Sequence, residues 1–330
     1  MKKTVVVCIT IIYAILLCAC SDNTTPSSLS GMYYDTLVNI DIYGAGSDGS
    51  QICDECKKLC EHYEQLFNKN IPGSDIYNIN HSEGHPVNVD HDTALMLSDT
   101  ISYAGDTGGL FDPTIEPLSS LWDFHDTGRT VPSDTSISAL LPLIGYHNVK
   151  VDISNDTVTL AKGTQIDPGA AGKGFIADRI GDYLLTCSIT GAIINMGGDI
   201  RVIGTKPNNS LFTIGINDPF NSGGIVTSLS LSDMSVATSG IYERCFTEGG
   251  KTYHHILDPS TGYPADTDIE SVTVICKNAV DADCLCTVAI LYGSQRAVDL
   301  IEKTKDTEAV IILTDKTIIK TSGADRFIVR

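Results

Sequence analysis

Residues 167–174 have the sequence Asp-Pro-Gly-Ala-Ala-Gly-Lys-Gly, a glycine-dense turn that leads directly into a predicted helix over residues 174–185. A buried strand is predicted next, over residues 192–195. Before the turn we expect a hairpin, because the apolar residues of 149–153 and 158–160 flank an Asn-Asp dipeptide. The turn therefore joins a region of strands to a helix that packs near further strands.

The segments on either side of this region also mix helices and strands. Apolar periodicity predicts strands over 37–43, 212–216, 226–231, 272–275 and 309–313, and helices over 50–67, 92–107, 281–291 and 294–303. The regular strand–helix alternation of a doubly wound sheet is missing. We therefore predict an α+β fold, with mixed sheets and packed helices.

Composition limits the partners that the chain can have. The chain has 330 residues, of which 42% are hydrophobic, so it can bury a substantial core. It carries 22 Lys and Arg against 41 Asp and Glu, a formal net charge of −19. This charge argues strongly against nucleic acid as a partner, since phosphate binding requires basic side chains. An anionic ligand stays compatible where a metal ion, backbone N–H groups or one Lys offset its charge.

The amino terminus combines a cationic start, Met1–Lys3, with an apolar run from Val5 to Leu17. The run is shorter than the about 20 residues that span a bilayer and has the length of a secretory signal. The Ala19-Cys20 step that follows resembles the bacterial lipobox. We predict a lipoprotein signal peptide over residues 1–19, a lipid on Cys20 and a flexible tether over residues 20–30. An ordinary signal peptide cleaved nearby and a weak membrane anchor are the alternatives.

Lipidation at Cys20 would hold the protein on a bacterial cell membrane, on its extracytoplasmic or periplasmic side. Of the 11 cysteines, removing Cys20 and the two in the signal peptide leaves 11 − 3 = 8. An even number permits disulfides without showing them. Cys53, Cys56 and Cys60 recur at i, i+3 and i+7, which favours a buried helical stripe over a metal site.

Several short segments carry residues suited to chemistry. In the 167–174 turn, N–H groups left free at the start of a helix, with Lys173 beside them, would suit a phosphate. A plain strand-to-helix turn is the alternative, because many such turns contain glycine. Residues 254–264 place His254 and His255 before Asp-Pro and Thr-Gly-Tyr-Pro, a rigid turn that displays two imidazoles. Hydrogen-bonded core histidines are the alternative there.

Asp283 and Thr287 lie four residues apart in the helix predicted over 281–291. This spacing stacks a carboxylate and a hydroxyl on one helix face. Oxygen ligands of this kind suit Mg²⁺, which usually shares the phosphates of a substrate. A solvated helix face is the alternative.

Six ordered motifs together resemble the ApbE family, the FAD:protein FMN transferases. They are FDPT with a following PL and LW at 111–122, DPGAAGKG at 167–174, NMGGD at 195–199, TSGIYER at 238–244, HHILDPSTGYP at 254–264 and ADCLCT at 282–287. The resemblance spans the mature chain from near Tyr34. It implies that residues 31–330 form one flavin transferase domain with an ApbE-like FAD-binding fold.

The resemblance also implies a role for particular residues. Mg²⁺ would be held by the main-chain oxygen of Ala170 and by Asp283 and Thr287. FAD would be contacted by Tyr34, Leu110, Phe111, Asp112, Asp167, Lys173 and Leu257. Many members carry an aromatic residue, placed to stack on the isoalloxazine ring, where this chain has Asn70.

The activity implied is Mg²⁺-dependent transfer of FMN from FAD to a Thr or Ser hydroxyl of an extracytoplasmic redox protein, with release of AMP. Acceptors would be subunits of Rnf-type or sodium-pumping quinone reductase-type membrane complexes. We expect Asp283 to be essential for catalysis and His255 to accept the hydroxyl proton, with His254 as the second choice, because imidazole titrates near neutrality. A Mg²⁺-dependent FAD pyrophosphatase, favoured by Asn70, and a non-catalytic FAD-binding lipoprotein are the alternatives.

Overall fold

The computed structural model describes residues 25–124 and 128–329. The predicted signal peptide, residues 1–19, and the predicted lipidation site Cys20 lie outside the described residues. Within the described ranges, no helix is both long enough and apolar enough to cross a membrane.

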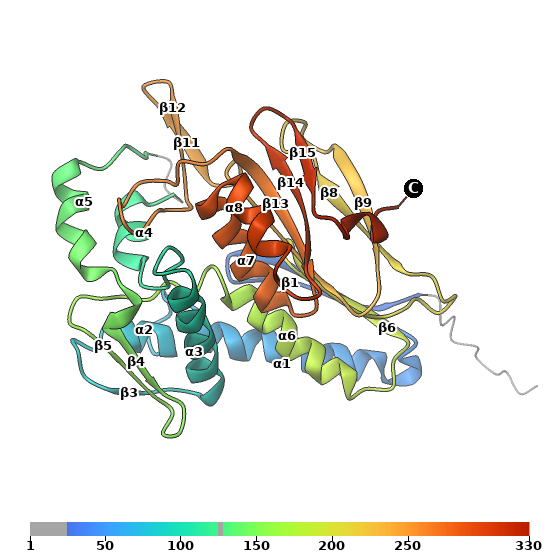
Figure 1. The fold of residues 1–330 in the computed structure, drawn as a ribbon. Coiled ribbons are helices and arrows are strands. Elements are labelled where there is room, and N and C mark those ends of the chain that lie inside the picture. Colours follow the sequence, from blue (N-terminus) through green and yellow to red (C-terminus); the bar gives the residue numbers. More distant parts are fainter. Residues whose placement is uncertain (1–24, 125–127, 330) are drawn as a thin grey trace, which may run out of the picture.

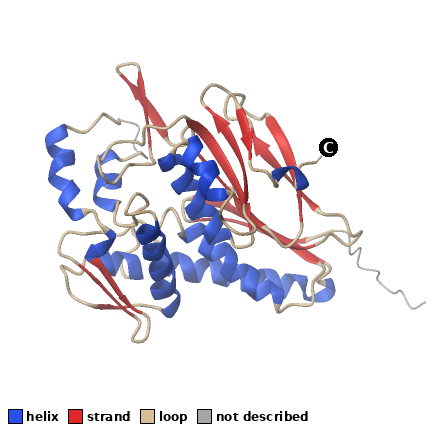
Figure 2. Ribbon diagram, viewed as in Figure 1, coloured by secondary structure: helices blue, strands red, loops and turns tan. Residues whose placement is uncertain are grey.

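An antiparallel sheet of eight strands forms the centre of the fold (Figures 1 and 2). Its strand order is β1-β2-β6-β7-β10-β13-β14-β15. The bounds are β1 (Ser27–Tyr33), β2 (Thr36–Tyr43), β6 (Gly191–Met196), β7 (Asp199–Gly204), β10 (Ser235–Gly240), β13 (Ile269–Cys276), β14 (Glu308–Leu313) and β15 (Ile318–Lys320). Neighbouring strands of this sheet are all antiparallel. Loops that are far apart in the sequence can therefore meet at the same end of the sheet.

Three smaller sheets surround the central one. The first has the order β3-β5-β4, the second is the β8–β9 hairpin and the third is the β11–β12 hairpin, which projects from the body (Figure 1). Their bounds are β3 (Val87–Asn88), β4 (Val149–Asp152), β5 (Thr157–Leu160), β8 (Phe212–Asn217), β9 (Ile225–Leu231), β11 (Cys245–Glu248) and β12 (Lys251–His254).

The helices pack mainly on one face of the central sheet, and the β8–β9 hairpin packs on the other. They are α1 (Gly49–Phe67), α2 (Asp75–Asn80), α3 (His91–Asp106), α4 (Glu116–Trp122), α5 (Asp134–Leu140), α6 (Gly172–Leu185), α7 (Ala279–Tyr292) and α8 (Ser294–Ile301). Val272 and Val274 of β13 lie in the core shared with α7 and α8, whereas Ile275 lies in the core shared with β8 and β9. This division follows from the alternation of side chains along a strand.

The α+β class predicted from the sequence is confirmed. The five predicted helices begin and end within two residues of α1, α3, α6, α7 and α8. The cysteine stripe is also confirmed, because Cys56 and Cys60 are fully buried in the core between α1, α6 and the sheet. The eight cysteines of the described residues are free thiols, and burial raises the pKa of Cys56 and Cys60 to about 12. Cys56 and Cys60 therefore fill space in the core and stay protonated at neutral pH.

The prediction that residues 20–30 form a flexible tether is wrong for residues 27–30. These residues belong to β1, which pairs with β2 from Ser27↔Ile42 to Tyr33↔Thr36. The stability of β1 comes from this backbone ladder and from Leu29, which packs against the core. Neither contribution is visible in the apolar periodicity of the segment alone.

Asp178 of α6 fixes the start of α7. Its Oδ1 accepts a hydrogen bond from Ala279 N at 2.9 Å and its Oδ2 one from Val280 N at 3.0 Å. Arg201 Nη1 lies 2.7 Å from Oδ1 and offsets the buried charge. One turn earlier, a Cβ added at Gly174 would lie 2.5 Å from Ala279 O, so glycine is what allows the two helices to approach this closely. These contacts set the position of every residue further along α7.

We predict that Asp178→Ala lowers the free energy of unfolding by about 2–4 kcal/mol, because it leaves Arg201 and two helix N–H groups without their buried partner. Urea denaturation followed by circular dichroism measures the change. Asp182→Ala is the matched control, because Asp182 also contacts Arg201 but is half exposed, and we expect a loss below about 1 kcal/mol. Equal losses in the two variants would contradict the role given to Asp178.

Candidate functional site

A cleft with a cavity volume of about 310 Å³ opens where the loops at one end of the sheet meet α4, α6 and α7. Its lining comes from the β1–β2 turn, the end of α1 and the loop after it, α3, the loop before α4 and α4 itself, the turn before α6 and the start of α6, the β6–β7 turn, the end of β10 and the loop after it, the segment after β12, and α7. All of the residues that the resemblance implies for FAD and metal binding line this one cleft, as does His255: Tyr34, Asn70, Leu110, Phe111, Asp112, Asp167, Ala170, Lys173, Leu257, Asp283 and Thr287. Their individual roles stay predictions.

The glycine turn at the start of α6 differs from the expected anion cradle. Most of its amides already have partners: Gly169 N donates to Asp167 Oδ1, Gly172 N donates to Pro168 O, and Gly174 N donates to Asp283 Oδ2. The expectation that this turn presents a row of free N–H groups is therefore wrong. These amides already have acceptors in the turn and on α7, so positive charge beside the turn comes from side chains such as Lys173 rather than from free N–H groups.

Lys173 lies between two buried carboxylates. Its Nζ is 2.9 Å from Asp199 Oδ2 and 3.6 Å from Asp283 Oδ2. Burial opposes the charged form of Lys173, but the two carboxylates outweigh it and raise the pKa of the lysine. Burial and then the charge of Asp199 raise the pKa of Asp283 to about 7. With both carboxylates ionised the cluster carries one net negative charge, which favours a bound cation.

The donor set of the cleft fits Mg²⁺. Asp283 and Thr287 supply a carboxylate and a hydroxyl one helical turn apart, and Ala170, whose main-chain oxygen the resemblance implies as a ligand, lines the same cleft. Within residues 25–124 and 128–329, no group of three or more His, Cys, Asp or Glu side chains is placed to hold a metal ion. A divalent ion in this cleft would therefore use a mixed set of hard oxygen ligands, as Mg²⁺ does.

A second lysine lies between two carboxylates on the other side of the turn. Lys69, in the loop after α1, contacts Glu116 Oε2 and lies 3.0 Å from Asp167 Oδ2. Ser120 Oγ donates to the other oxygen of Glu116 at 2.6 Å. Burial, followed by the charge of Asp167, raises the pKa of Glu116 to about 7. Sequence reasoning did not find Lys69 and Glu116, because no motif joins them.

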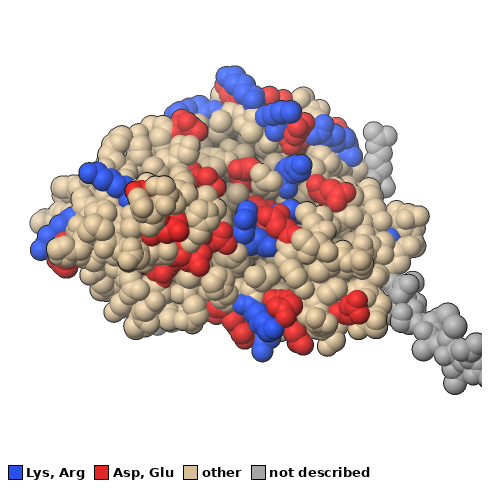
Figure 3. All heavy atoms as spheres, turned by 90° about the horizontal axis from the view of Figure 1, so that it is seen from below, with Lys and Arg blue, Asp and Glu red and all other residues tan. Residues whose placement is uncertain are grey.

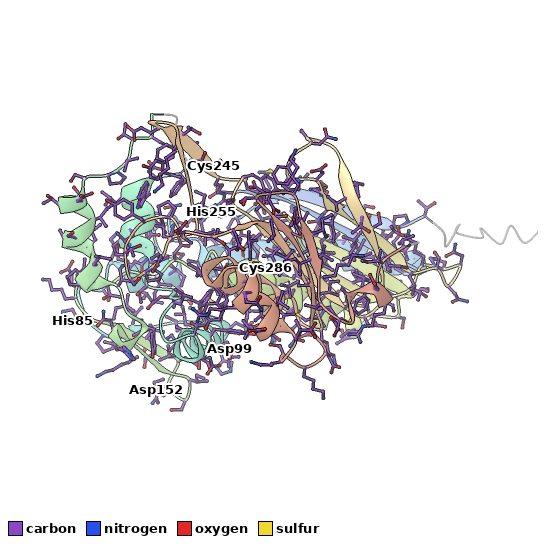
Figure 4. The ribbon with its side chains drawn as sticks, turned by 45° about the horizontal axis from the view of Figure 1, so that its top comes forward. His85, Asp99, Asp152, Cys245, His255 and Cys286 are labelled. Carbon is purple, nitrogen blue, oxygen red and sulfur yellow. The ribbon has the colours of Figure 1, made fainter. Side chains whose placement is uncertain are left out.

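The two neighbouring histidines have different surroundings. His255 directly follows β12 at the base of the projecting hairpin and lines the cleft (Figure 4). His254 is buried, and its Nε2 lies 3.1 Å from Ala265 O, which gives it a structural role. Among the described residues, the Nδ1 atoms of both are buried without a hydrogen-bond partner. His255 is therefore the better placed of the two to meet a substrate.

The FDPT segment holds its own loop together. Asp112 Oδ1 accepts hydrogen bonds from Thr114 N at 2.8 Å and Thr114 Oγ1 at 2.6 Å, and its Oδ2 accepts one from Tyr146 N at 2.7 Å. This carboxylate thus shapes the wall of the cleft. On the facing side, Tyr34 has a left-handed φ of 54°, and its hydroxyl donates to Cys60 O, which anchors the β1–β2 turn on α1.

Comparisons with known proteins identify the family and the fold. The model described as the ApbE family matches residues 34–311. The FAD:protein FMN transferase from Klebsiella pneumoniae is 34% identical to this chain, and the alignment covers 80% of this chain and 83% of the relative. The FAD:protein FMN transferase from Treponema pallidum is 30% identical, and the alignment covers 87% of this chain and 84% of the relative. The crystal structure of the ApbE protein from Thermotoga maritima has a TM-score of 0.84 at 31% identity, covering 92% of this chain and 99% of that one.

The fold is thus that of the ApbE flavin transferases. The chain belongs to the ApbE family.

We predict that the ring of His255 stays neutral down to pH 5, because burial and then the nearby Arg244 lower its pKa to about 4. The ordinary pKa of histidine is about 6.5, so between pH 6.5 and pH 4 this side chain binds a proton in the unfolded chain but not in the folded chain. The free energy of unfolding therefore falls as the pH falls through this range. Histidine NMR titration, assigned with His255→Gln, measures the pKa. His91 is the internal control, because Asp156 raises its pKa above 6.5. A His255 pKa at or above 6.5 would contradict the prediction.

Proposed function

We propose that this chain is a Mg²⁺-dependent FAD:protein FMN transferase that acts on an extracytoplasmic redox protein. One observation carries the proposal: residues from six separate family motifs converge on a single cleft, where Lys173 lies between Asp199 and Asp283 beside the oxygen donors of Ala170 and Thr287. A cleft of this charge and shape suits the pyrophosphate of a dinucleotide together with a divalent ion.

In the proposed reaction, the Thr or Ser hydroxyl of the acceptor attacks the FMN phosphorus of FAD. An oxygen–phosphorus bond forms to the acceptor, the bond to the AMP phosphate breaks, and AMP leaves. Lys173 would supply a fixed positive charge next to the phosphates. His255 is uncharged at neutral pH and would accept the hydroxyl proton, but its pKa of about 4 makes it a weaker base than the near-neutral imidazole expected from the sequence. Mg²⁺ held by Ala170 O, Asp283 and Thr287 would offset the charge that develops on the phosphate oxygens.

The acceptor and the cellular location are further parts of the proposal. Lipidation at Cys20 would keep the enzyme at the outer side of the cytoplasmic membrane or in the periplasm, within reach of membrane redox complexes. We propose acceptor subunits of the Rnf-type or sodium-pumping quinone reductase-type complexes. The support is the amino-terminal sequence and the names of the relatives as FAD:protein FMN transferases.

The test is incubation of the protein with FAD, Mg²⁺ and a purified candidate acceptor. AMP release is followed by chromatography, and flavin fluorescence is recorded on the denatured acceptor band. AMP together with a fluorescent band supports transfer, whereas AMP alone supports hydrolysis. Neither product, with FAD still bound, would support a binding protein without catalysis.

FAD hydrolysis to FMN and AMP is the second candidate activity, and Asn70 is the observation that favours it. Asn70 is exposed and lines the cleft, where an amide cannot cover the flavin ring as an aromatic side chain would. Water could then reach the pyrophosphate in place of an acceptor hydroxyl.

We predict that Asn70→Phe lowers the ratio of free FMN to acceptor-linked FMN by at least about threefold, because a ring stacked on the flavin excludes water from the site. The two products are separated by precipitating the acceptor and measuring flavin in the pellet and the supernatant. Asn78→Phe on α2 is the control, since this residue does not line the cleft. An unchanged ratio in Asn70→Phe would show that this position does not set the balance.

We predict that Asp283→Ala reduces Mg²⁺-dependent AMP release by about 100-fold or more, because it removes the only carboxylate of the proposed metal ligands. Initial rates are measured across a Mg²⁺ titration. Asp281→Ala is the matched control: Asp281 lies on the same helix but contacts Tyr103 and Asn278, outside the cleft. Activity in Asp283→Ala equal to that of the control would remove Asp283 from the metal site.

A further inference from the structure

The ammonium group of Lys69 joins three separate segments of the cleft. Lys69 belongs to the loop after α1, Glu116 is the first residue of α4, and Asp167 begins the turn before α6. The lysine contacts both carboxylates, and its side chain is 27% exposed, against 8% for Glu116 and 21% for Asp167. The three groups are thus largely removed from water, where such contacts are poorly screened.

The contact continues from Asp167 into the turn. Asp167 accepts the Lys69 contact on Oδ2 and, at 2.9 Å, the hydrogen bond of Gly169 N on Oδ1. Lys173 Nζ then donates to Gly169 O at 3.3 Å. The N–H group of Gly169 is therefore held by Asp167, which Lys69 contacts, and its carbonyl group is held by Lys173. These contacts constrain the backbone directly before Ala170.

Removing the charge of Lys69 would leave two carboxylates facing each other in a poorly solvated place. Two carboxylates left facing each other without a cation repel, and the repulsion is relieved when they separate or when one of them takes up a proton. Glu116 is fixed in α4 and by Ser120, whereas Asp167 lies in a turn, so we expect Asp167 to be the one that moves. The expected response is a displacement of the turn that carries Gly169 and Ala170.

We propose that Lys69 is a positioning residue of this site: by holding Glu116 and Asp167 together, it fixes the 167–172 turn in the conformation that binds FAD. The proposal rests on the proposed function in so far as FAD occupies the cleft. It assigns to Lys69 an action through Asp167 rather than a contact with the reacting atoms.

The experiment measures the Kd of FAD for the full-length protein by quenching of FAD fluorescence, with and without Mg²⁺. Lys69→Met keeps the length of the side chain and removes its charge, and we expect the Kd to rise roughly tenfold. Glu116→Gln alone should change the Kd by no more than about twofold, because the side-chain oxygen of Gln can still accept the contact from Lys69, which also keeps its contact with Asp167. The double variant Lys69→Met/Glu116→Gln should return to within about threefold of the wild type, because it removes the surplus charge and supplies N–H donors to Asp167.

Lys162→Met is the matched control, because Lys162 forms an exposed ion pair with Glu83 and does not line the cleft. We expect its Kd to equal that of the wild type. Thermal unfolding checks that each variant is folded. If Lys69→Met does not fold, two other variants still test the proposal: Lys69→Arg, which keeps the charge, and the double variant. Both should bind FAD.

Two results would overturn the proposal. An unchanged Kd in folded Lys69→Met would show that the turn does not depend on this lysine. A loss in Lys69→Met that Glu116→Gln does not restore would show that Lys69 contacts FAD directly. Failure of the proposed function is separate, because it would appear as FAD binding by the wild type without AMP release.

Discussion

Helices α6 and α7 cross at Gly174, where even one methyl group would collide with the backbone of Ala279. Asp178 holds the first amides of α7 at this crossing, and Gly174 N donates to Asp283 Oδ2. The carboxylate of Asp283 and the glycine turn are therefore parts of one joint rather than two neighbouring loops. Because packed helices move as units, the distance between the donors on α7 and those on the turn is set in the core and not by the cleft itself.

The charge distribution explains how a strongly acidic protein can accept an anionic dinucleotide. Over the face shown in Figure 3, basic side chains lie among acidic ones, with no large basic area. Within the cleft, Lys69 and Lys173 each lie between two carboxylates, one on either side of Gly169. Positive charge is thus present in the cleft but is compensated locally. A ligand that brings its own divalent ion fits such a site better than a bare polyanion does.

Much of this arrangement could be predicted from the sequence, and the exceptions have a common physical cause. The long helices and the residues of the motifs follow from local periodicity and from short-range spacing, as for Asp283 and Thr287. Lys69 and Glu116 lie 47 residues apart, and their contact exists only because the loop after α1 and the start of α4 meet in the fold. Asp199 and Lys173 each stand in a recognisable motif, but their contact could not be predicted without the structure, because the two motifs are separate in the sequence. In the same way, the amides of the glycine turn looked free in the sequence, although their acceptors lie in the turn and on α7.

Strand β1 lies at the edge of the sheet and runs toward the cleft, with Ser27↔Ile42 as its first pair and Tyr33↔Thr36 as its last. Tension applied from the amino-terminal side would peel this strand from Ser27 onward. The pairs next to Tyr34 would separate last, after the rest of the ladder had opened. A protein held by its amino terminus could therefore lose the outer part of an edge strand under mechanical strain while the wall of its cleft stayed in place.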